Sequence, residues 1–121
     1  MAMSSNMVFS LDGALARVDY DQEIFQAMAE IFVDQGPRDL ADTQAALAAR
    51  DAAALARSAH RLKGAILQFC APSVFEATKE LEELGKAGNL DSAAKVCAQL
   101  ETELFRLVAA LRDHLAKGLR A

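Results

Sequence analysis

A short run of residues near the middle of the chain carries side chains suited to nucleophilic chemistry. The run reads His60-Arg61-Leu62-Lys63-Gly64. A neutral imidazole is a competent nucleophile near pH 7, because its unperturbed pKa is about 6.5. Lys63 follows three residues later, which on a helix places its ammonium close enough to neutralise an anion, such as a phosphoryl oxygen, at the imidazole. The run therefore predicts a histidine nucleophile with a cation beside it.

His60 is expected at the edge of its helix, within reach of solvent. Apolar residues recur along this segment in steps of four and three, which is typical of helices that pack in bundles. At about 100° per residue, His60 lies a full step away from Ala59, a member of that apolar stripe. The residues one turn before and after it, Ala56 and Gly64, are small. The stripe comprises Leu55, Ala59, Leu62, Ile66 and Phe69.

Gly64 is unusual because it falls in the middle of the expected helix. Glycine there costs about 1 kcal/mol relative to alanine, so its presence calls for a reason. The missing side chain would leave room for a partner to approach the imidazole. Arg57 and Arg61 add positive charge to this helix, although the chain as a whole has a net charge of -4. Each feature is common on helix surfaces, but the combination favours a functional site.

Neither histidine has the neighbours that a metal centre in a helical bundle requires. Bundles that bind two metal ions use Glu-x-x-His pairs on facing helices. Arg57 stands three residues before His60, and Leu111 stands three before His114. We therefore predict no metal site. His114 lies near the end of the last expected helix, where a cation suits the helix dipole, and we assign it no function.

The composition indicates an all-α protein of one domain. The chain has 121 residues, of which 53% are hydrophobic, with many alanines, and only 6% are aromatic. Alanine is the best helix former. Two prolines and six glycines are too few for a sheet protein with many turns. We expect a disordered tail over residues 1–8 and a single domain over 9–121.

Capping residues and apolar periodicity predict a short N-terminal helix followed by an up-and-down antiparallel four-helix bundle. The short helix begins at Ser10 or Asp12. A longer helix follows Asp19 or Asp21, and Gly36-Pro37 either kinks it or splits it. The remaining helices are expected to begin at Asp51, near Pro72, and at Asp91, with short antiparallel connections. The expected core positions outside the His60 helix are Ile24, Phe25, Met28, Ile31 and Phe32, then Val74, Ala77, Leu81 and Leu84, and finally Cys97, Leu100, Leu104, Leu107, Leu111 and Leu115.

Charge and segment composition exclude several classes of protein. The net negative charge argues against nucleic acid as the main ligand, because binding to its phosphates needs a basic protein surface. No apolar run approaches the length that spans a membrane, and the first residues lack the pattern of a signal peptide. Cys70 and Cys97 form no disulfide framework, so we expect free thiols and a cytoplasmic protein. The chain has no Gly-rich phosphate loop, so we expect a carrier without kinase activity rather than an independent enzyme.

The run around His60 resembles the signature of histidine-containing phosphotransfer (HPt) domains. The similarity extends over most of the chain, including the approach AALAARDAAALARSAH and the later LEELGKAGNLDSAAKVCAQLETEL. Members of this family are four-helix bundles that accept a phosphoryl group from a receiver aspartate and pass it to another. The resemblance implies that His60 is the phosphoacceptor, that Lys63 is its electrostatic partner and that Gly64 provides clearance.

The resemblance also implies a partner for the second nitrogen of the imidazole. Family members often hold it with Gln or Glu from the next helix, and that place corresponds to Glu82, one step from the core residue Leu81. A solvated Glu82 with no such role is the alternative. Two departures from the family pattern are Ala65, where Ser is common, and Cys70-Ala71, where Gly-Ala is common. Ala65 removes a potential hydrogen bond to the phosphoryl group, and Cys70 alters the end of the helix.

The expected partners are response-regulator receiver domains, a hybrid sensor histidine kinase, or both. We expect a monomer that needs no cofactor, with the divalent metal supplied by the receiver. The alternatives are a helical interaction module without catalysis, the phosphoacceptor domain of a larger kinase, and a metal-binding bundle, which the residues before the two histidines disfavour. The residues expected to contact the partner are Ala56, Arg57, Arg61, Leu67 and Gln68.

Overall fold

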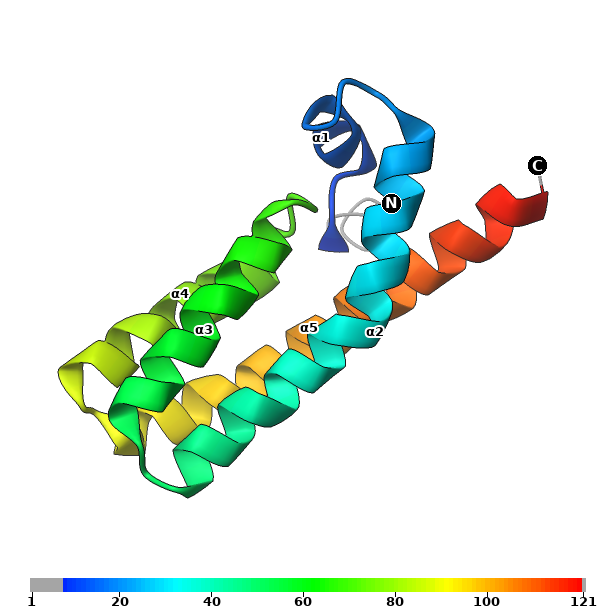
Figure 1. The fold of residues 1–121 in the computed structure, drawn as a ribbon. Coiled ribbons are helices and arrows are strands. Elements are labelled where there is room, and N and C mark those ends of the chain that lie inside the picture. The colour runs from blue at the N-terminus through cyan, green and yellow to red at the C-terminus, as the bar shows by residue number, and fades with distance from the viewer. Residues whose placement is uncertain (1–7, 121) are drawn as a thin grey trace, which may run out of the picture.

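The computed structural model describes residues 8–120, which form a four-helix bundle with one short helix across its end (Figure 1). Each bundle helix packs against two others, because α2 contacts α3, α3 contacts α4, α4 contacts α5, and α5 closes the ring against α2. Residues 8–120 contain no strand, and the expected all-α bundle is confirmed. The helices are α1 (Leu11–Ala16), α2 (Gln22–Ala48), α3 (Ala52–Leu67), α4 (Pro72–Ala87) and α5 (Leu90–Arg120).

Side-chain caps start three of the helices at residues that the sequence proposed. Ser10 accepts a hydrogen bond from the Gly13 amide, Asp21 from Ile24, and Asp51 from Ala54. Each cap satisfies an amide that the first helical turn leaves without a partner.

The last helix begins before the expected Asp91. Asn89 caps it, because its Oδ1 accepts a hydrogen bond from the Ser92 amide at 3.3 Å and its carbonyl accepts one from the Ala93 amide. Asp91 therefore lies in the first turn, where a carboxylate still favours the helix dipole.

The two prolines have different roles. Pro37 lies inside α2, which runs unbroken from Gln22 to Ala48, so Gly36-Pro37 does not split this helix. Pro72 is the first residue of α4, where a missing amide hydrogen costs nothing. Gly88 ends α4 in the left-handed conformation, with φ of 74°.

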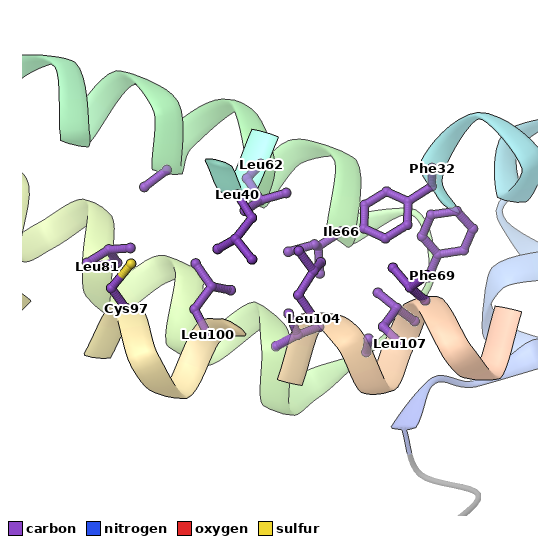
Figure 2. Close-up of a cluster of buried hydrophobic side chains, with 14 of the residues drawn as sticks. Phe32, Leu40, Leu62, Ile66, Phe69, Leu81, Cys97, Leu100, Leu104 and Leu107 are labelled. Atoms are coloured by element: carbon purple, nitrogen blue, oxygen red, sulfur yellow. The ribbon is translucent and has the colours of Figure 1, made fainter. Parts of the chain in front are cut away.

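The core lies along the axis of the bundle, and α3 contributes its apolar stripe as expected (Figure 2). Leu62 and Ile66 point toward Leu100 and Leu104 of α5. At one end, the rings of Phe32 and Phe69 lie 5.2 Å apart. Every residue of the predicted α3 stripe and of the predicted α5 stripe is buried. This packing buries one face of α3 and leaves the opposite face, which includes His60, to solvent.

Two predicted core positions on α2 are wrong. Ile24 and Ile31 are 47% and 66% exposed. The helix contacts the bundle through Phe25, Ala29 and Phe32, one step further round, because α3 and α5 lie on that side. The expected core positions Ala77 and Leu84 of α4 are only half-buried; the buried positions include Val74, Thr78, Leu81 and Glu82.

The expected N-terminal tail falls mostly outside the described residues. Of residues 1–8, only Val8 is described, and it packs partly buried against the core. None of the helices in the described part combines the length and apolar character needed to cross a membrane.

Candidate functional site

The imidazole of His60 projects from the solvent-facing side of α3, with its side chain 70% exposed. This placement agrees with the one predicted from the periodicity of the helix. The ring is nevertheless held, because Nδ1 lies 2.8 Å from Oε2 of Glu82 on the adjacent helix α4. One nitrogen of the ring is therefore fixed by the protein.

Glu82 is a buried carboxylate surrounded by three nitrogens. Its side chain is 5% exposed, and besides His60 it contacts the ammonium groups of Lys63 at 2.7 Å and Lys86 at 3.2 Å. These contacts lower the pKa of Glu82 from 4.5 to about 2. The hydrogen bond from Lys63 has the largest effect, burial opposes it, and the hydrogen bonds from His60 and Lys86 add to it. Glu82 is thus ionised at neutral pH.

The charge on Glu82 determines the tautomer of the histidine. An ionised carboxylate can only accept hydrogen bonds, so Nδ1 of neutral His60 donates its proton to Glu82. The lone pair then resides on Nε2. This arrangement presents a nucleophilic nitrogen whose ring orientation is fixed by α4.

The two lysines at Glu82 occupy different positions. Lys63 of α3 contacts Oε1 and is 27% exposed, whereas Lys86 of α4 contacts Oε2, the oxygen that also accepts from His60, and is 67% exposed. Lys63 is one of the predicted site residues, and its ammonium binds the carboxylate. Lys86 was missed, although its spacing of four residues from Glu82 is the signal of a helical ion pair.

A close contact between α3 and α4 lies near His60 and Glu82, at Ala56 and Gly85. A Cβ atom on Gly85 would lie 3.0 Å from the amide nitrogen of Ala56 and 3.1 Å from its Cα. The helix backbones can approach this closely only because Gly85 has no side chain. Ala56, a predicted site residue, therefore helps to bring α3 and α4 together one turn from the imidazole.

Gly64 has no such packing reason. A Cβ atom built at this position meets nothing within 4 Å, among the residues that the structure describes. It lies one turn after His60 on the exposed face, and Leu67, which is 44% exposed, lies two turns after His60. The fold alone does not require glycine here.

The two arginines near His60 point in different directions. Arg57 borders a surface hollow of about 300 Å³ that is also lined by Ala56, His60, Glu82 and Lys86, which we call the His60 hollow. Arg61 turns toward α2, where its guanidinium lies 3.8 Å from Asp39 and 3.7 Å from Asp42.

The remaining predicted contact residue, Gln68, also lies on the α2 side of the helix. It lines an apolar groove of about 170 Å³ between α2 and α3, together with Met28, Ile31 and Ala65. The structure thus brings Ala56, Arg57, Lys63 and Glu82 together at the imidazole, and places Arg61 and Gln68 on a neighbouring surface.

The two departures from the family pattern have visible structural consequences. Ala65 faces the apolar groove on the α2 side. Cys70 follows α3 in the left-handed conformation, with φ of 51°, and its carbonyl accepts a hydrogen bond from the Ser10 amide at 3.0 Å. A Cβ on Gly13 would lie 2.9 Å from the Cys70 sulfur, so α1 packs directly on the end of α3.

The site is suited to carrying a group on nitrogen. Within residues 8–117, no group of three or more histidine, cysteine or acidic side chains is arranged to bind a metal ion. The chemistry that the site offers is an exposed Nε2 nucleophile flanked by cationic side chains, with a buried carboxylate behind the ring.

Comparisons with known proteins agree with this geometry. The model of the Hpt domain family matches residues 27–114. The fold is similar to that of histidine-containing phosphotransfer protein B from Pseudomonas aeruginosa PAO1, with a TM-score of 0.84 and 24% identity over 91% of this chain and 96% of that one. It is also similar to the HPT domain of a sensor hybrid histidine kinase from Shewanella, with a TM-score of 0.82 and 20% identity over 92% and 96% of the two chains. A search of the curated proteins found no match.

Proposed function

The chain belongs to the Hpt domain family and has a histidine phosphotransfer role in phosphorelays, and we propose that it carries the phosphoryl group on Nε2 of His60. The observation that carries this assignment is the 2.8 Å contact between Nδ1 of His60 and the buried carboxylate of Glu82. It leaves the lone pair on the exposed nitrogen, where a partner can reach it.

In the accepting step, Nε2 attacks the phosphorus of a phospho-aspartate on the partner. The N–P bond forms as the P–O bond to the aspartate breaks, and the aspartate carboxylate leaves with that electron pair. The ring then carries a positive charge, with its proton still on Nδ1. Glu82 lies beside this proton and stabilises the charged ring through a charge-assisted hydrogen bond.

The donating step is the reverse reaction with a second aspartate. Its carboxylate attacks the phosphorus, the N–P bond breaks, and the ring leaves as a neutral imidazole because Nδ1 has kept its proton. Glu82 must not remove that proton. With a pKa of about 2, Glu82 is too weak a base to do so. The lysines that lower its pKa therefore support transfer in both directions.

The partners are proposed to be receiver domains, either free response regulators or parts of hybrid sensor kinases. The receiver would supply the divalent metal, because phosphoryl transfer depends on positioning and charge neutralisation. Gly64 would provide the clearance that lets its active site reach Nε2. Docking would use the exposed face of α3, with Leu67 and Gln68, and the neighbouring apolar surface at Ile31.

Incubation with a panel of phosphorylated receiver domains tests the assignment. We expect an acid-labile, base-stable label on the wild-type chain and on His114→Gln, and no label on His60→Gln. Circular dichroism should show that all three proteins are folded, because His60 is exposed and His114, whose ring packs edge-on against Phe25, is only half-buried. Label that persists on His60→Gln, or a wild-type chain that no receiver labels, would contradict the proposal.

A further inference from the structure

The His60 hollow has a net positive charge, because two of its lining side chains are cationic and only one is anionic. Arg57 contributes from α3 and Lys86 from α4, on either side of the imidazole. Arg57 is exposed and forms no ion pair with any residue that the structure describes. Two cations therefore border an open space beside a nucleophilic nitrogen.

From this arrangement we infer that the hollow receives the phosphoryl group once it is bound to His60, with Lys86 and Arg57 as its cationic ligands, whereas Lys63 is a positioning residue that holds Glu82. The inference rests on the proposed function. It assigns the electrostatic role to Lys86 and Arg57, and not to Lys63 of the His-x-x-Lys run.

The contacts of Lys63 favour a fixed role. Its ammonium lies 2.7 Å from Oε1 of Glu82, and its side chain is 27% exposed. Moving it to a phosphoryl group would leave Oε1 of a buried carboxylate without its strongest partner, which is costly. Lys63 therefore stays with Glu82 while the phosphoryl group is present.

Lys86 is free to move at lower cost. Its ammonium contacts Oε2 at the longer distance of 3.2 Å, its side chain is 67% exposed, and His60 already donates to the same oxygen. A phosphoryl group brings about two negative charges at neutral pH, which attract an ammonium at the rim of the hollow. Lys86 can turn to it while Lys63 and His60 keep Glu82 satisfied.

The carboxylates near the hollow each have a cationic partner, which limits their repulsion of the phosphoryl group. On the α2 side, Asp39 and Asp42 are paired with Arg61. On α4, the charge of Glu82 is balanced by Lys63, and neutral His60 also donates to this carboxylate. The net field at the hollow thus comes from Arg57 and Lys86.

Phosphorus NMR of the chain phosphorylated with phosphoramidate tests this division of roles. Nε2 displaces ammonia from phosphoramidate, so no partner protein is needed. A neighbouring cation stabilises the doubly charged phosphoryl group and lowers its second pKa. We expect Lys86→Gln and Arg57→Gln each to raise that pKa by about half a unit or more. Lys86→Arg should restore it, Lys63→Gln should raise it less than Lys86→Gln does, and the control Lys95→Gln on α5 should leave it unchanged.

Nitrogen-15 spectra of the unphosphorylated imidazole provide the second measurement. Lys63→Gln should shift the Nδ1 signal of His60, because Glu82 loses its main partner, whereas Lys86→Gln should shift it less. A phosphoryl pKa that responds to Lys63→Gln and not to Lys86→Gln would overturn the inference and leave the phosphoacceptor assignment intact. Labelling of His60→Gln by phosphoramidate to the wild-type extent would instead overturn the proposed function.

Discussion

Glu82 joins the two helices of the site by accepting hydrogen bonds from both. Lys63 and His60 reach it from α3, and Lys86 reaches it from its own helix. A buried charge is tolerated only when it is paired and hydrogen-bonded, and removal of one partner is costly. The carboxylate is therefore part of the stability of the bundle as well as part of the site.

Because folding lowers the pKa of Glu82, the free energy of unfolding depends on pH. Between its ordinary pKa of 4.5 and its folded value of about 2, the unfolded chain binds a proton at Glu82 that the folded chain does not bind. The free energy of unfolding therefore falls as the pH falls through this window, and the contribution of Glu82 is fully present only above it. We expect wild type to lose stability more steeply than Glu82→Gln between these pH values.

Urea unfolding of the two proteins at a series of pH values measures this difference. Glu83→Gln is a suitable control, because Glu83 is the exposed neighbour of Glu82 on the same helix. Equal slopes for wild type and Glu82→Gln would show that the carboxylate is not held in its charged form by the fold.

The sequence predicted which residues lie near the site better than it predicted where their side chains point. The exposure of His60 followed from its angle to Ala59, and the place of Glu82 followed from the family resemblance. Arg61 turns to α2 because Asp39 and Asp42 lie across the helix interface, which the local sequence of α3 does not reveal. Lys86 was overlooked because Glu-Lys pairs four residues apart are common on ordinary helix surfaces.

At the scale of helices, two glycines on adjacent helices differ in the space around them: one faces open space and the other packs against a backbone. Gly64 of α3 has open space where a side chain would be, and Gly85 of α4 touches the backbone of Ala56. Alanine at each position adds the same methyl group and gains the same helix propensity. The pair therefore separates the effect of propensity from the effect of packing.

We expect Gly64→Ala to raise the free energy of unfolding by up to about 1 kcal/mol, because alanine is the better helix former and its methyl group meets nothing. Gly85→Ala should be less stable than Gly64→Ala by roughly 1–3 kcal/mol, since its methyl group forces α3 and α4 apart. Chemical denaturation measures both. If Gly85→Ala were as stable as Gly64→Ala, the contact with Ala56 would not limit the approach of the helices.

The ends of the helices were more predictable than their faces. Ser10, Asp21 and Asp51 act through local backbone geometry, which a short segment of sequence determines. The inward face of α2 depends instead on where α3 and α5 lie. Because α2 carries apolar residues on more than one face, periodicity alone assigned Ile24 and Ile31 to the core, although both are exposed.

At the scale of the whole molecule, the four long helices close into a ring, so no helix lacks a neighbour on either side. The buried stripes of α3 and α5 meet in the middle (Figure 2), and the contact between His60 and Glu82 lies on the α3–α4 face. The position of the proposed site is therefore set by the packing of the bundle, to which its buried member Glu82 also contributes.

We predict that the chain is a monomer, because its bundle is complete and a relay partner must dissociate after each transfer. Analytical ultracentrifugation over a wide range of protein concentration should give a single species near 13.0 kDa. The unfolding midpoint should also be independent of concentration. A mass that approaches twice this value as concentration rises would contradict the prediction.

The contact between Gly85 and Ala56 has a consequence for anyone who wishes to move this chemistry into another protein. It limits the separation of the α3 and α4 backbones, so main-chain packing sets the gap that the imidazole and its carboxylate must bridge. A designer who copied only the histidine, the glutamate and the lysines would inherit the functional groups without their separation. The first residues to transplant are the two small ones, and the reactive ones come second.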